Sequence, residues 1–128
     1  MKLYSVNEAY ELKDTLHNQH IYIEGLLTYE NDNISLSHWP KKEQKKHSIW
    51  IEETQGAFRY NHTALKKLSN KRVVCLGNFQ SKITEETIDW YWGFGHLGCW
   101  GMQIVATELL YYKKWHQANN SYKNEVKK

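Results

Sequence analysis

The sequence is poor in proline, in cysteine and in long apolar runs. With one proline among 128 residues, 41% hydrophobic residues and 24% charged residues, its composition excludes a disordered tract or a linker. Cys75 and Cys99 are too few for a disulfide scaffold and lack the paired spacing of a zinc site, which favours reduced, buried thiols. No stretch approaches the about 20 apolar residues of a membrane helix, and Glu8 precedes any signal-peptide core. We therefore expect one folded domain in the cytoplasm.

Basic residues are concentrated in two places. The formal net charge is +3, but five lysines and one glutamate lie after residue 112, which leaves 12 basic and 13 acidic residues in 1–112. Within that body, a basic loop surrounds only Glu43 and consists of Lys41, Lys42, Lys45 and Lys46. The charge pattern is that of a mildly acidic body with a basic loop and a basic tail. These are either a solvated loop and a frayed tail or a phosphate-binding site.

Hydrophobic periodicity predicts five strands and two helices. Ser5 and Glu8 match a capping box, and apolar residues recur at helical spacing up to residue 18. Asn61 or Thr63 caps a second, short helix that ends near residue 69. Alternating apolar residues predict strands over 20–30, 34–38, 48–52, 71–80 and 102–112.

The order of these elements predicts the fold. Five strands with one helix between the third and the fourth are the arrangement of the OB-fold, a small Greek-key barrel. Gly25 and Gly77 lie inside the first and fourth strands, where glycine marks a bulge or a tight bend. The segment 71–79, followed by Gly95-His96-Leu97-Gly98, resembles the second half of small bacterial OB-fold proteins. The resemblance implies a binding surface on the second and third strands and on the loops between strands one and two and strands four and five.

We therefore predict a mainly β protein, a five-stranded OB-fold-like Greek-key barrel. The barrel covers residues 19–115, an N-terminal helix within residues 1–18 packs on it, and residues 116–128 form a flexible basic tail. Alternation assigns to the core Ile21, Ile23, Ile34, Leu36, Ile49 and Ile51. The outward face then carries Tyr22, Glu24, Ser35, Ser37, Trp50 and Glu52.

The outward face favours a protein partner over an oligonucleotide. Tyr22 and Trp50 are able to stack bases, at about 1–3 kcal/mol per base. However, Glu24 and Glu52 lie beside them and repel a phosphate chain.

The segment 90–101 is unusually aromatic. Its rings form an interaction surface if they face outward and a lid on the barrel if they face inward. Together with the outward face, it supplies the predicted partner-binding residues: Tyr22, Trp50, Trp90, Tyr91, Trp92, Phe94, His96 and Trp100.

The sequence contains no assembled catalytic or metal-binding set. His38 and His47 flank one loop without an evident third ligand, and His96 with Cys99 lacks an orienting group. We expect no enzymatic activity, no metal and no cofactor.

Two functions fit these observations. The first is a non-enzymatic protein-binding module, such as an immunity protein that blocks the active site of a toxin. The alternative is an OB-fold protein that binds single-stranded nucleic acid through Trp50 and the basic loop of Lys41, Lys42, Lys45 and Lys46.

Overall fold

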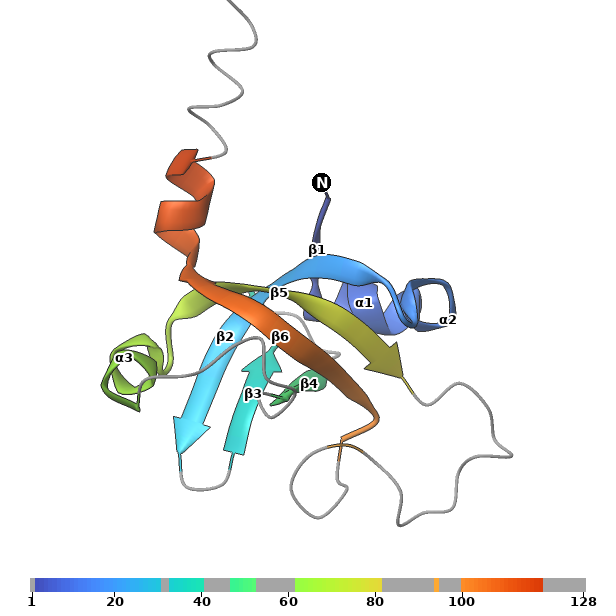
Figure 1. The fold of residues 1–128 in the computed structure, drawn as a ribbon, viewed down its shortest axis with the longest axis horizontal. Coiled ribbons are helices and arrows are strands. Elements are labelled where there is room, and N and C mark those ends of the chain that lie inside the picture. The colour runs from blue at the N-terminus through green and yellow to red at the C-terminus, as the bar shows by residue number, and fades with distance from the viewer. Residues whose placement is uncertain are drawn as a thin grey trace, which may run out of the picture.

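The fold was derived from a computed structural model of the chain, which describes residues 2–30, 33–40, 47–52, 62–81, 94 and 100–118. The architecture is mainly β, with a few short helices outside the strands (Figure 1). In chain order the elements are β1 (Leu3–Ser5), α1 (Val6–Glu11), α2 (Lys13–Leu16), β2 (His20–Glu30), β3 (Asn33–Ser37), β4 (Ser48–Glu52), α3 (His62–Leu68), β5 (Arg72–Ser81) and β6 (Met102–Tyr111). No helix in this part of the chain is long and apolar enough to cross a membrane.

Five of the strands close into a barrel. The order in the sheet is β2-β3-β4-β6-β5, and an antiparallel pairing of β5 with β2 completes the circle. The β4–β6 pair is parallel, whereas β2–β3, β3–β4 and β5–β6 are antiparallel. This order confirms the predicted five-stranded, OB-fold-like barrel with α3 between its third and fourth strands.

The N-terminal region is more divided than the sequence predicts. The capping box is present, because the Glu8 N–H donates to Ser5 Oγ and the Ser5 N–H donates to Glu8 Oε1. The helix is interrupted at Leu12, where φ is −104° and ψ is 16°, and no glycine or proline signals this break. β1 was not predicted, since its three residues form a strand only by parallel pairing with β2.

The chain after β6 also differs from expectation. Residues 112–118 form a short helical segment that continues directly from the strand (Figure 1). This segment crosses the predicted boundary between the barrel, 19–115, and the flexible tail, 116–128. Residues 119–128 lie outside the described residues.

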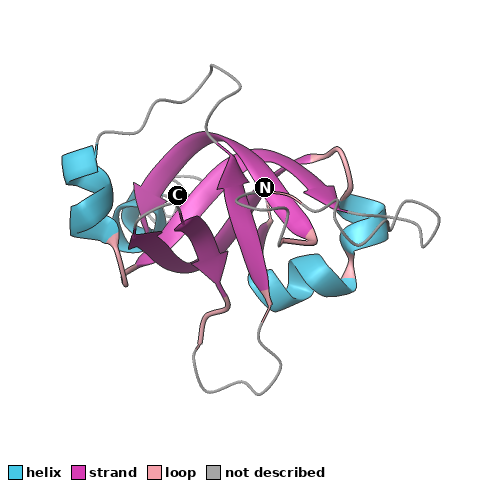
Figure 2. Ribbon diagram, turned by 90° about the horizontal axis from the view of Figure 1, so that it is seen from below, coloured by secondary structure: helices cyan, strands magenta, loops and turns pink. Residues whose placement is uncertain are grey.

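The core fills the barrel as alternation predicts. Ile21, Ile23, Leu36, Ile49 and Ile51 are all buried, and Ile34 is half-buried against the same cluster. The short helices extend this core, because α1 contributes Val6 and Ala9, α2 contributes Leu16 and α3 contributes Leu65. Figure 2 shows these helices packed at the margins of the strands.

Gly25 and Gly77 are required by close approaches of the backbone. A Cβ on Gly25 would lie 2.6 Å from the Ser37 carbonyl oxygen, at the point where β2 exchanges β1 for β3 as its neighbour. A Cβ on Gly77 would collide with the Val105 carbonyl oxygen, next to the register shift between Leu76 and Gly77. The predicted bulge is confirmed at Gly77, where the register shifts, whereas at Gly25 the β2–β5 register is regular and the structure shows a tight contact that excludes a side chain.

Candidate functional site

A group of aromatic side chains surrounds Arg72 on the outside of the barrel. Its members come from β2, the segment after β3, β5 and the helical segment 112–118. We call this group the Arg72 cluster, and it consists of Tyr22, Glu24, Trp39, Arg72, Tyr112, Trp115 and His116.

The Arg72 guanidinium is held from two directions. Its Nη2 lies 2.6 Å and its Nε 2.9 Å from Glu24 Oε2, and only 14% of the Glu24 side chain is exposed. Its Cζ lies 3.5 Å from the centroid of the Tyr112 ring and 5.3 Å from that of Trp39. The planar guanidinium is thus able to use its N–H edge for the carboxylate and its face for an aromatic ring. Its charge is compensated by Glu24.

The rings of the cluster connect the helical segment to the barrel. Trp115 makes an edge contact with Tyr22, with centroids 6.0 Å apart, and lies 6.2 Å from Tyr112. Tyr112 also stacks with His116 at 5.5 Å. Tyr22, Tyr112 and Trp115 are half-buried, so the contacts hold the rings in place and leave part of each exposed.

A second aromatic surface contains two of the residues that the sequence singled out. The Trp50 and Trp100 rings are 4.9 Å apart and tilted by 53°, and both residues are half-buried. We call this pair the Trp50–Trp100 surface. Phe94 and Trp100 form a short antiparallel bridge, because the Phe94 N–H donates to the Trp100 carbonyl at 2.7 Å and the reverse bond measures 3.1 Å. The indole Nε1 of Trp50 is buried without a hydrogen-bond partner in the described part of the chain.

The predicted partner-binding residues are thus divided between two surfaces. Tyr22 belongs to the Arg72 cluster, while Trp50, Phe94 and Trp100 lie together beside β4 and β6. The other predicted residues lie outside the described residues: Trp90, Tyr91, Trp92 and His96, and the basic loop of Lys41, Lys42, Lys45 and Lys46.

Two residues of the predicted outward face differ from expectation. Ser35 is 3% exposed, although it alternates with the core residue Leu36. It lies directly opposite Trp50 in the β3–β4 ladder, where the much larger indole is placed to cover it. Glu24 is not a free carboxylate that repels phosphate, because Arg72 neutralises it.

Two of the described histidines have neighbouring partners, and the described cysteine is buried. His38 Nδ1 accepts from the Asn7 N–H, whereas His47 stacks on Tyr10 with centroids 3.6 Å apart. Burial raises the pKa of the Cys75 thiol, which keeps it protonated and a poor nucleophile. No cluster of three or more histidine, cysteine or acidic side chains suited to a metal occurs among the described residues.

A pocket of about 430 Å³ lies between α1 and the segment after β3. We call it the α1 pocket. Glu8, Glu11 and Leu12 line one side, and His38, Trp39 and Pro40 line the other. Trp39 therefore belongs both to this pocket and to the Arg72 cluster.

Sequence reasoning missed most of the Arg72 cluster. Trp39, Arg72, Tyr112 and Trp115 are separated in the chain and form no local motif. Opposite charges on paired strands were the one signal in the sequence: Arg72 is the only arginine of β5, and β5 pairs with β2, which carries Glu24. Cross-strand pairing of these charges would have brought them together.

No protein-family model and no curated protein matches the sequence. Among solved structures, the chain is similar to one described as "OBody AM3L09 bound to hen egg-white lysozyme". The two are 13% identical, and the match covers 75% of this chain and 83% of that chain with a TM-score of 0.44. At this sequence identity and TM-score, the similarity does not support a functional assignment. The fold is established by the strand order of this chain.

Proposed function

We propose that this protein is a non-enzymatic protein-binding module that contacts its partner through the Arg72 cluster. The observation that carries the proposal is the pairing of Arg72 with Glu24 beneath partly exposed tyrosine and tryptophan rings. Tryptophan, tyrosine and arginine are the residue types that dominate protein interfaces energetically.

Because Glu24 compensates the charge of Arg72, the Arg72 cluster is better suited to a protein partner than to a phosphate group. Binding to a nucleic acid depends on cations that displace counterions from phosphates. Arg72 is committed to Glu24 at 2.6 Å, so recruiting it to a phosphate would leave a carboxylate that is 14% exposed without its partner. A protein surface that buries the rings and leaves the ion pair intact avoids this cost.

The cluster is also prepared before binding. Arg72 contacts Tyr112, Trp115 contacts Tyr22, and these contacts limit the rotamers available to four large side chains. Ordering each such side chain at an interface costs about 0.5–1.5 kcal/mol, so rings held in advance improve affinity.

The finer form of the proposal is a toxin inhibitor of the immunity-protein type, acting in the cytoplasm. The partner's active site would be blocked by occlusion, with the aromatic rings as anchors and the surrounding charges setting the rate of encounter. Its support is the resemblance found in the sequence and the preformed aromatic surface.

Binding to a co-expressed candidate toxin from the neighbouring reading frame tests the proposal. We expect Trp115→Ala to weaken the complex by about tenfold or more, because it removes a large ring from the cluster. Lys66→Ala, on the exposed surface of α3, is the matched control and is expected to leave affinity unchanged. Surface plasmon resonance gives the affinities, and circular dichroism verifies that each variant is folded.

Two results would overturn the proposal. One is that none of the candidate toxins binds this protein. The other is a complex that Trp115→Ala and Lys66→Ala weaken equally, since the aromatic surface would then have no special role.

Single-stranded nucleic acid is the alternative ligand, favoured by the half-buried Trp50 and Trp100 rings beside β4. Its signature is affinity that falls steeply with salt. Tight, salt-sensitive oligonucleotide binding that is lost in Trp50→Ala would replace the protein-binding proposal.

A further inference from the structure

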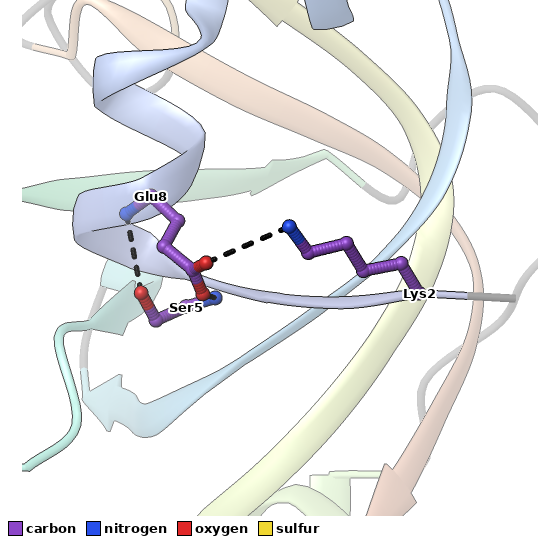
Figure 3. A network of polar contacts seen from close by, with 3 residues as sticks. All are labelled: Lys2, Ser5 and Glu8. Carbon is purple, nitrogen blue, oxygen red and sulfur yellow. Dashed lines mark hydrogen bonds and ion pairs between the residues drawn. The ribbon is translucent and has the colours of Figure 1, made fainter.

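The α1 pocket has a rigid wall. The Ser5 and Glu8 capping box fixes the start of α1, and Figure 3 shows the Glu8 carboxylate between Ser5 and Lys2. On the other side His38 is only 3% exposed, and its Nδ1 accepts the Asn7 N–H at 3.2 Å. The pocket is therefore formed in advance by contacts that link α1 to the segment after β3.

The lining combines acidic and apolar groups. Glu11 is exposed and makes no ion pair with any other described residue, whereas Glu8 shares its charge with Lys2 at 3.8 Å. Leu12, at the break between α1 and α2, is 41% exposed and is the only large hydrophobic residue so exposed in the described part of the chain. Trp39 and Pro40 face it across the pocket.

This lining is complementary to a long cationic side chain. Carboxylates attract the charged head, and Leu12, Trp39 and Pro40 provide apolar area for the methylene stem. No lysine or arginine is among the described residues that line the pocket. Its volume of about 430 Å³ lies within the usual range of about 300–1,000 Å³ for ligand pockets. That volume leaves room for an apolar neighbour of the cation.

We propose that the α1 pocket binds an arginine or lysine side chain of the protein partner together with an adjacent apolar side chain. This inference rests on the proposed function, since it assigns the partner's chemistry at a second contact. The pocket is continuous with the Arg72 cluster through Trp39, so one partner surface is able to reach both.

Amide NMR with two blocked dipeptides tests the pocket without the natural partner. The probes are acetyl-Leu-Arg-amide and acetyl-Leu-citrulline-amide, which differ in charge but hardly in shape. We expect the arginine peptide to shift the Glu11 and Leu12 amides and the Trp39 indole, and to bind about five- to tenfold more tightly than the citrulline peptide at low salt.

Removing the charge of Glu11 tests whether its carboxylate binds the cation. Glu11→Gln is expected to weaken arginine-peptide binding by about three- to fivefold. Glu30→Gln is the matched control, because it removes an exposed carboxylate at the hairpin end of β2 and β3, away from His38. It is expected to leave peptide binding unchanged.

Three outcomes would overturn the inference. The first is that no pocket resonance shifts at peptide concentrations up to about 10 mM, and the second is that the arginine and citrulline peptides bind equally well. The third is that the pocket resonances shift with protein concentration alone, which would mean that a second copy of the chain occupies the pocket. None of these outcomes involves Trp115, so the surface plasmon resonance comparison of Trp115→Ala with Lys66→Ala tests the proposed function separately.

Discussion

The Arg72 cluster and the Trp50–Trp100 surface use the same types of side chain in different ways. In the first, a guanidinium is paired with Glu24 and covered by rings, so its charge is satisfied within the protein. In the second, the buried Trp50 Nε1 makes no hydrogen bond in the described part of the chain. The bulge between Leu76 and Gly77 lies between the part of β5 that holds Arg72 and the part that pairs with β6 near Trp100. The comparison shows two ways of holding aromatic rings: around an ion pair in the Arg72 cluster, and by ring contact and a backbone bridge in the Trp50–Trp100 surface.

The largest expected effect comes from introducing a steric clash at the bulge in β5 that lies between the two surfaces. Gly77→Val would place a branched side chain against the Val105 carbonyl oxygen, which belongs to the backbone of the neighbouring strand and cannot rotate away. We expect a loss of about 3 kcal/mol or more in the free energy of unfolding, measured by urea denaturation.

Gly101→Ala is the control for that change, because nothing lies within 4 Å of the added Cβ. Its stability is expected to stay within about 0.5 kcal/mol of the parent. Equal losses in the two variants would show that the close approach at Gly77 does not limit stability.

An intermediate effect is expected from breaking the charge pair that distinguishes the Arg72 cluster. Glu24→Gln keeps the shape of the side chain and leaves the Arg72 charge without its carboxylate. We expect a destabilisation of about 1–2 kcal/mol, because the pair is largely shielded from solvent. Glu30→Gln, at an exposed position, is expected to cost close to nothing. If both variants had the stability of the parent, Glu24 would not organise the cluster.

The smallest effect tests the ring that covers Arg72. Tyr112→Leu keeps apolar volume but removes the aromatic face 3.5 Å from Cζ, and a loss of about 0.5–1 kcal/mol is expected. Tyr112→Phe retains the face and should remain within a few tenths of the parent. Tyr111→Leu changes a neighbouring half-buried tyrosine on β6 and serves as the control. Denaturation curves in which Tyr112→Phe and Tyr112→Leu lose equal stability would exclude a cation–π contribution.

The strands were predictable because each carries its own signal. Ile21 and Ile23, and Ile49 and Ile51, repeat at the two-residue period of a strand with one buried face, and the structure buries all four. The capping box of Ser5 and Glu8 was equally predictable, since both residues lie within one helical turn. By contrast, β1 forms only through its pairing with β2, and no local pattern indicates either this strand or the break in the helix at Leu12.

The candidate surfaces were predictable only in part. The aromatic content of the segment before β6 drew attention to Trp100, but the contact with Trp50 depends on the parallel pairing of β4 with β6. The outward position of Ser35 followed from alternation, whereas its burial depends on the size of the side chain opposite.

The sequence by itself determined the five barrel strands and their inward-facing isoleucines, because the two-residue alternation that marks them is local. The close contacts that require Gly25 and Gly77 come from Ser37 and Val105 on neighbouring strands, so they depend on the tertiary structure. Only the tertiary structure decided that Glu24 meets Arg72, 48 residues away, and that Trp39 and Tyr112 enclose the guanidinium. Those contacts exist because β5 pairs with β2 to close the barrel, and the register of that pairing is a property of the whole fold.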